Sequence, residues 1–178
     1  MHLLFVCTGN ICRSPIGERL AAAYGAERQI PDLVTSSAGT RAVIAHPIHD
    51  QAALVLEGLG GDATNFSARQ LTPKIAAQAD LILTMTRDHR DKVLSLAPRL
   101  LRSTYTLSEA AQLASLEGVG SVADFSRLRP LLKAGAAEDV PDPINQGPEV
   151  FAEVGNTIAR LLAPVIELCD PLSPGRHG

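Results

Sequence analysis

The sequence predicts an α/β fold built on a parallel β-sheet. The short apolar runs Leu3–Cys7 and Asp80–Met85 are almost continuous, which is typical of strands buried on both faces of a parallel sheet. Segments with apolar residues at helical spacing follow them. Alternation of strand and helix along a chain is the pattern of parallel α/β folds.

The first strand, Leu3–Cys7, ends at Gly9, and we expect a helix to begin at about Arg13 or Ser14. Pro15 is compatible with this start, because the amides of a first helical turn have no partner within the helix. The following apolar residues share one helical face: Ile16, Leu20, Ala23 and Tyr24.

The remaining elements are expected in alternating order. Before the middle of the chain they are a strand at Leu33–Ser36 closed by Ala38–Thr40, a helix at Pro47–Leu59 that stops at Gly60, a helix at Thr72–Ala79 and the strand Asp80–Met85. After it they are a helix at Asp88–Ala97, a strand at Ser103–Leu107, a helical region at Ser108–Ala137 interrupted at Glu117–Gly120, a loop at Val140–Pro143 and a helix at Pro148–Leu168.

Length and composition limit the class of protein. The chain has 178 residues, is 46% hydrophobic and carries a formal net charge of −3. We therefore expect one domain at residues 1–170, a disordered tail at 171–178, and a monomer or weak homodimer. The charge gives no reason to expect a nucleic-acid partner. Without an apolar run of membrane-span length or a signal-peptide pattern, we also expect no membrane association and a cytoplasmic location.

The stretch CTGNICRS, from Cys7 to Ser14, is typical of an oxyanion-binding turn. A strand-to-helix turn directs unpaired amides and the positive end of the helix dipole at one point. Gly9 and Asn10 tolerate the left-handed backbone that curls such a loop, and the guanidinium of Arg13 suits two oxygens of a tetrahedral anion. We expect the phosphate-binding residues to be Thr8, Gly9, Asn10, Ile11, Cys12, Arg13 and Ser14.

The same turn is expected to activate Cys7. The amides, helix dipole and guanidinium that hold an anion would also stabilise a thiolate, which would make Cys7 a nucleophile at neutral pH. Ser14 would donate a hydrogen bond to that sulfur, including when it acts as a leaving group. A lone cysteine at a strand end is more often a buried hydrophobe, but the surrounding pattern favours chemistry.

These motifs resemble the low-molecular-weight protein tyrosine phosphatase family. The pattern C-x5-R-S near the N-terminus is typical of it, and further matching segments follow in the family's order: Val34–Thr40, His46–Ile48, Ser67–Thr72, Ala79–Arg87 and Asp142-Pro143. The stretch from Ser103 to Ala137 matches least well.

The resemblance implies a three-layer sandwich with a four-stranded parallel sheet in the order 2-1-3-4 and helices on both faces. It implies a cysteine-dependent phosphomonoester hydrolase that acts on a phosphorylated protein or small phosphomonoester through a phosphocysteine intermediate. Cys7 would be the nucleophile, Arg13 the oxyanion clamp and Asp142 the general acid and base. Asn10, Ser14 and Ser37 would support the loop, and neither a metal nor a cofactor is expected.

Some positions differ from the usual family pattern. Phe66 stands where many members have a histidine, and aromatic residues are missing where tyrosine-specific members have them, at Arg41–Ile44 and Ile144–Asn145. An arginine-phosphatase branch tends to have threonine where this chain has Ile11, so phosphotyrosine is the first expectation and phosphoarginine the alternative. An arsenate-reducing branch needs additional cysteines in the middle of the chain, and none occurs between Cys12 and Cys169.

The other cysteines and histidines have weaker patterns. Cys12 is expected either to form a reversible disulfide with Cys7, as in related phosphatases, or to pack under the loop. Cys169 is expected in the core. No histidine shows metal-ligand spacing, and we expect structural or surface roles for His46, His49 and His89.

Two other classes of function compete with hydrolysis. A non-catalytic phosphate- or phosphopeptide-binding module would use the same cradle, but it would not need Cys7 and Asp142 together. A thiol-disulfide protein would use Cys7 and Cys12, but the residues between them favour anion binding.

Overall fold

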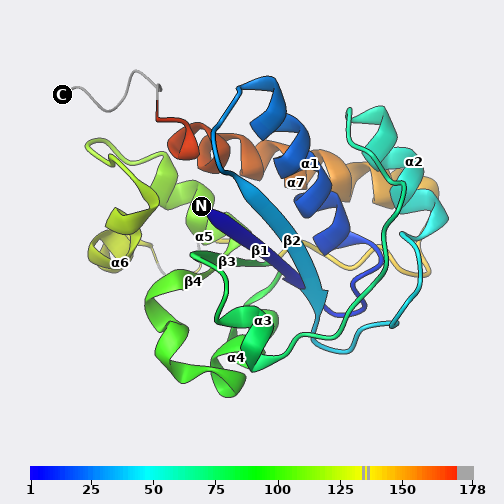
Figure 1. The fold of residues 1–178 in the computed structure, drawn as a ribbon, viewed down its shortest axis with the longest axis horizontal. Helices are drawn as coiled ribbons and strands as arrows, with labels where there is room; N and C mark the ends of the chain where they lie inside the picture. The colour runs from blue at the N-terminus through cyan, green and yellow to red at the C-terminus, as the bar shows by residue number, and fades with distance from the viewer. Residues whose placement is uncertain (134, 136, 172–178) are drawn as a thin grey trace.

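The computed structural model of the protein describes residues 1–133, 135 and 137–171. Within these residues, four parallel strands form one sheet in the order β2-β1-β3-β4 (Figure 1). The strands are β1 (His2–Cys7), β2 (Val34–Gly39), β3 (Leu81–Thr84) and β4 (Thr104–Thr106). The predicted fold class and strand order are confirmed.

Helices cover both faces of the sheet (Figure 1). One face carries α1 (Arg13–Glu27), α2 (Asp50–Gly58), α5 (Leu107–Ala114) and α7 (Pro148–Cys169). The other carries α3 (Pro73–Ala76) and α4 (Arg87–Leu96). Because β1 and β3 lie in the middle of the sheet with helices on both sides, their sequences are continuously apolar rather than alternating.

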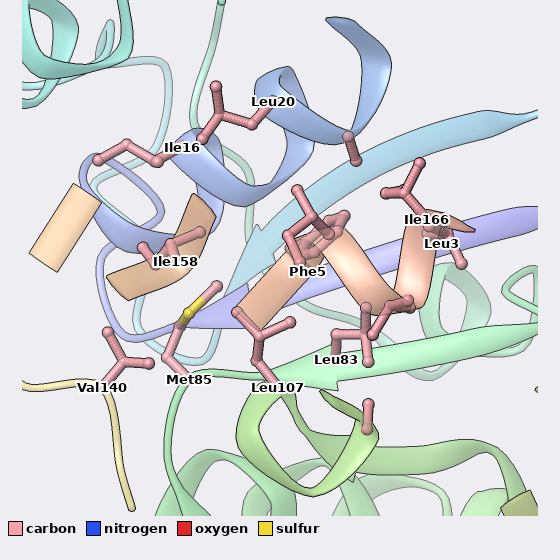
Figure 2. Close-up of a cluster of buried hydrophobic side chains, with 14 of the residues drawn as sticks. Leu3, Phe5, Ile16, Leu20, Leu83, Met85, Leu107, Val140, Ile158 and Ile166 are labelled. Atoms are coloured by element: carbon pink, nitrogen blue, oxygen red, sulfur yellow. The ribbon is translucent and has the colours of Figure 1, made fainter. Parts of the chain in front are cut away.

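Successive residues of β1 enter different hydrophobic cores. Leu3 and Phe5 point toward α1 and α7, where they meet Ile16, Leu20, Ile158 and Ile166 (Figure 2). Leu4 and Val6 face the smaller core beneath α4. This two-residue alternation fixes the register of β1 and carries the chain to Cys7 at the carboxyl edge of the sheet.

Several element ends differ from the sequence-based expectation. Strand β2 continues to Gly39, through residues that were expected to close it. Helix α2 begins only at Asp50, because the side chain of His49 accepts a hydrogen bond from the Gln51 amide and so caps the helix. Helix α3 is a single turn, capped by Thr72.

The expected helical region at Ser108–Ala137 is broken into short pieces, so that expectation was wrong in its extent. Helix α5 ends at Ala114 and is followed by the 3-10 turn η2 (Val122–Asp124), the short helix α6 (Phe125–Leu128) and a second turn, η3 (Arg129–Leu131). Pro130 lies inside η3 and has no amide hydrogen, so a regular helix cannot continue through it.

Part of the expected tail, residues 172–178, lies outside the described residues. Within the part of the chain that is described, no helix combines the length and the apolar composition that crossing a bilayer would require.

Candidate active site

The loop between β1 and α1 is held by hydrogen bonds on its outer side. The carbonyl oxygens of Cys7, Thr8 and Gly9 accept from the amides of Thr40, Arg41 and Val43, each at 2.9 Å. The Ile11 carbonyl accepts from the amide of His49 at 2.8 Å. In a trans peptide plane the N–H points away from the carbonyl, so these bonds leave the following amides facing the loop interior.

Those amides and the N-terminus of α1 form a cradle for an oxyanion. Asn10 has φ 56°, the left-handed conformation expected for this position. Helix α1 begins at Arg13 with no side-chain cap on its first amides, so they and the helix dipole are directed at the same point. Local backbone geometry thus gives the loop the arrangement of an anion site, and the amides of Thr40, Arg41, Val43 and His49 hold it in that shape.

Asn10 joins the loop to the sheet through side-chain hydrogen bonds. Its side chain is fully buried and donates to the hydroxyls of Ser14 at 2.9 Å and Ser37 at 2.8 Å. Its side-chain oxygen accepts from the Arg69 amide at 2.8 Å. The position of Phe66 does not interrupt this network, because the Arg69 backbone supplies the donor.

Glu18 extends the same network and was not found from the sequence. The hydroxyl of Ser37 donates to its carboxylate at 2.5 Å. Burial raises the pKa of Glu18, while hydrogen bonding from Ser37 and the charges of Arg19 and Arg69 lower it. The signal in the sequence was a carboxylate four residues, or about one helical turn, after Ser14 in α1.

The nucleophile candidate contacts the serine that ends the loop. Cys7 Sγ lies 2.9 Å from Ser14 Oγ, and both residues are buried. Ser14 Oγ accepts a hydrogen bond from Asn10, and among its contacts the sulfur is the atom that can accept its single proton. The contact therefore stabilises a thiolate rather than a thiol.

Arg13 lies beneath the loop that carries the general-acid candidate. Its Nη1 donates to the carbonyl of Val140 at 2.9 Å, and its Nη2 lies 3.1 Å from Asp142 Oδ2. Val140 is held in place because its amide donates to the Met85 carbonyl at the end of β3, at 2.8 Å. Figure 2 shows Val140 beside Met85 at this edge of the core. Residues distant in sequence thus meet at one point.

Cys12 is a free thiol that is buried at the start of α1. Burial raises its pKa to about 12; the neighbouring Cys7 and Asp142 act in the same direction, and Arg13 opposes them. Cys12 therefore remains protonated at neutral pH and cannot compete with Cys7 as a nucleophile. Cys169 is buried, as expected.

The three histidines have different surroundings. His46 is exposed, whereas His49 caps α2 and stacks on Phe151 with ring centroids 4.9 Å apart. His89 is buried at the start of α4, and its Nε2 lies 2.8 Å from Thr8 Oγ1. This contact with the loop could not be read from the sequence, because no spacing links the two segments.

The residues beside the cradle are aliphatic rather than aromatic. A Cβ built on Gly9 would lie 3.5 Å from both Ile11 and Val43, which places these two side chains at the loop. Val43 and Ile44 are 39% and 64% exposed. Among the described residues, no group of three or more histidine, cysteine or acidic side chains is arranged to hold a metal ion.

Comparisons with known proteins identify the family. The profile of the low molecular weight phosphotyrosine protein phosphatase family matches residues 2–118. A putative low molecular weight protein-tyrosine-phosphatase of Klebsiella pneumoniae is 30% identical over 152 residues, which cover 85% of each chain.

Two solved structures are also similar. The low molecular weight protein tyrosine phosphatase from T. tengcongensis is 28% identical with a TM-score of 0.75, covering 94% of this chain and 98% of the other. The YwlE arginine phosphatase from Geobacillus stearothermophilus is 26% identical with a TM-score of 0.73, covering 93% and 90%. The chain belongs to the low molecular weight phosphotyrosine protein phosphatase family.

Proposed function

We propose that this protein is a protein tyrosine phosphatase whose nucleophile is Cys7 and whose reaction passes through a phosphocysteine intermediate. The observation that carries the proposal is the convergence of Cys7, Ser14, Arg13 and Asp142 around one loop, with Cys7 Sγ 2.9 Å from Ser14 Oγ and Arg13 Nη2 3.1 Å from Asp142 Oδ2. A site that only bound phosphate would need neither the thiol nor the carboxyl group.

In the first step the Cys7 thiolate attacks phosphorus. The S–P bond forms while the bond to the leaving oxygen breaks, and protonated Asp142 gives its proton to that oxygen. The loop amides and Arg13 hold the three remaining phosphoryl oxygens. A guanidinium has five donors, so its contacts with Val140 and Asp142 leave N–H groups for these oxygens.

In the second step water attacks the phosphocysteine. Asp142, now a carboxylate, accepts a proton from the water as the new P–O bond forms and the S–P bond breaks. Ser14 stabilises the departing thiolate through the hydrogen bond that it makes to Cys7. The electrostatic work is done by fixed donors and by Arg13, so these steps need no metal ion.

Phosphotyrosine is the substrate favoured by Ile11 and by the names of relatives such as the Klebsiella pneumoniae protein and Etp of Escherichia coli. Phosphoarginine is the second candidate, and one specific observation supports it. The residues that would flank a phenyl ring are Val43, Ile44, Ile144 and Asn145, none of which is aromatic, and stacking on aromatic residues would favour a phenyl ring.

Family membership also bears on the class of substrate. Proteins of this family act on phosphorylated proteins or phosphomonoesters, and we infer a phosphorylated protein as the substrate here. We further propose that residues 1–170 act as one unit in the cytoplasm, where Cys7 and Cys12 would stay reduced.

Rapid-mixing hydrolysis of p-nitrophenyl phosphate tests the mechanism. The wild-type protein should show a burst of p-nitrophenol, and Cys7→Ser should abolish both burst and turnover while still binding vanadate. Absence of turnover in reduced wild-type protein, together with tight vanadate binding, would instead identify a phosphate-binding module.

A second comparison tests the substrate. Initial rates on a tyrosine-phosphorylated peptide and on the same peptide with phosphoarginine give the ratio of kcat/KM for the two. Ile11→Thr is the matched variant, because it introduces the residue typical of the arginine branch. A wild-type ratio that favours phosphoarginine would overturn the assignment to phosphotyrosine.

A further inference from the structure

His89 connects helix α4 to the candidate phosphate-binding loop. The residue is 2% exposed. Nε2 lies 2.8 Å from Thr8 Oγ1, and Nδ1 lies 2.9 Å from Thr86 Oγ1. Thr8 directly follows Cys7, so a chain of hydrogen bonds runs from the cap of α4 to the residue beside the nucleophile.

The donor and the acceptor in each of these hydrogen bonds follow from which atoms carry a proton. Thr86 Oγ1 accepts a hydrogen bond from the His89 amide at 3.2 Å, which is the capping contact of α4. Among the contacts of this hydroxyl, Nδ1 is the atom that can accept its single proton, and a proton on Nδ1 would leave the hydroxyl proton without an acceptor there. Burial, and secondly the charge of Arg13, lowers the pKa of His89 to about 4, so the ring carries one proton at neutral pH. With Nδ1 as acceptor, that proton is on Nε2.

An Nε2–H group donates to Thr8 Oγ1. The hydroxyl of Thr8 then accepts from His89, and its own proton is directed elsewhere. Thr8 is half-buried at the loop, and His89 lies within electrostatic range of both Arg13 and Asp142. Among the described residues, Thr8 Oγ1 has this contact with His89 and no side-chain or carbonyl acceptor for its own proton, so the proton is available to an oxyanion bound in the loop.

We propose that Thr86 and His89 orient the Thr8 hydroxyl as an additional hydrogen-bond donor to the phosphoryl group, beyond the loop amides and Arg13. Thr8 is then a binding residue through its side chain, and His89 is a positioning residue that acts through Thr8. This role rests on the proposed phosphatase function, but binding of an oxyanion reports on it without turnover.

Nuclear magnetic resonance of protein labelled with 15N-histidine tests the tautomer directly. The expected result at neutral pH is a neutral His89 ring with the proton on Nε2 and none on Nδ1. A proton on Nδ1 would make Thr8 the donor to His89, and the proposed role of Thr8 would be wrong.

Vanadate binding and steady-state kinetics test the donor. Thr8→Val removes the hydroxyl with little change in shape and should weaken vanadate binding about tenfold, as expected for one hydrogen bond to a charged group. Thr8→Ser should restore it. His89→Phe should weaken vanadate binding by a similar factor. His89→Gln should recover part of that loss, because its side-chain amide can donate to Thr8. The double variant Thr8→Val/His89→Phe should bind vanadate as well as Thr8→Val alone.

These outcomes separate the inference from the proposed function. If Cys7-dependent turnover is normal and Thr8→Val binds vanadate like the wild type, the Thr8 role fails and the phosphatase assignment stands. If the wild type has no turnover, but the His89 tautomer and the vanadate affinities of the variants are as expected, the phosphatase assignment fails and the role of Thr8 as a donor stands. Additive losses in the double variant would also overturn the coupling of His89 to Thr8.

Discussion

Arg13 Nη2 lies 3.1 Å from Asp142 Oδ2, and the two side chains have very different exposures, 5% for Arg13 and 50% for Asp142. The guanidinium is fixed at the floor of the cradle, whereas the carboxylate is half open to water. This arrangement suits a fixed oxyanion clamp and an acid that must exchange protons with solvent and with a leaving oxygen.

Asp142→Asn should lower kcat for p-nitrophenyl phosphate by on the order of a hundredfold, because the amide cannot donate a proton to the leaving oxygen in the way a carboxylic acid does. Asp139→Asn is the matched control. Asp139 lies three residues earlier and pairs at the surface with Arg87, so its variant should keep nearly normal turnover. Equal losses in both variants would point to disruption of the loop rather than to acid catalysis.

Gly39→Ala should damage activity through the backbone. A Cβ at Gly39 would lie 2.4 Å from the carbonyl oxygen of Thr8 and 3.0 Å from Ala42 Cα. Backbone atoms cannot move aside as a flexible side chain would, so the loop must shift. We expect a loss in kcat/KM of at least tenfold, since small displacements of reacting groups are costly. Gly58→Ala, where a Cβ meets no atom within 4 Å, is the control, and unchanged kinetics in Gly39→Ala would contradict the close packing.

Ser37→Ala should loosen the support of the loop. The change removes one acceptor of Asn10 and the donor to Glu18. Because burial already raises the pKa of Glu18 and the bond from Ser37 lowers it, its loss should raise that pKa further.

We expect Ser37→Ala to lower the free energy of unfolding by about 1–3 kcal/mol and to reduce kcat. Urea unfolding and steady-state kinetics measure the two effects. The adjacent Ser36→Ala is the control, because Ser36 bonds to His2, outside the loop network. Normal turnover in Ser37→Ala would show that Asn10 and Ser14 hold the loop without it.

The buried His89 predicts a pH dependence of stability. Its pKa is lowered from 6.5 to about 4, first by burial and then by Arg13, with Lys92 acting in the same direction and Asp88 and Asp142 opposing. Between these values the unfolded chain binds the proton and the folded chain does not. The free energy of unfolding should therefore fall as the pH drops from 6.5 toward 4, by about 2 kcal/mol after allowance for solvent screening.

Urea unfolding of the wild type and of His89→Gln over this pH range measures that contribution. The variant lacks the titrating ring, so its stability should fall less steeply with acid. Parallel curves for the two proteins would mean that His89 is protonated in the folded state without penalty.

Cys12→Ser should make inactivation by hydrogen peroxide harder to reverse. In the wild type, peroxide would oxidise the Cys7 thiolate to a sulfenic acid, and the Cys12 thiol would then form a disulfide with release of water. Because the pKa of Cys12 is about 12, the disulfide should form faster as the pH rises. Recovery of activity with dithiothreitol after peroxide measures the protection, and equal recovery in both proteins would leave Cys12 as a packing residue.

The sequence alone determined the parts of this protein that depend on neighbours along the chain. The buried run of β1, the turn at Gly9 and Asn10 and the start of α1 near Arg13 follow from local rules of apolar pattern, backbone conformation and helix termini. The turn after β1, with its left-handed Asn10 and its helix start at Arg13, was therefore predicted from eight residues.

Tertiary structure decided everything that requires distant segments to meet. Asp142 reaches Arg13 because the Val140 amide is bonded at the end of β3, and Glu18 reaches Asn10 only through Ser37 on β2. His89 meets Thr8 because α4 follows β3, and β3 pairs with β1 in the sheet. No periodicity or spacing encodes these contacts, since they arise from the order of strands in the sheet and the packing of helices upon it.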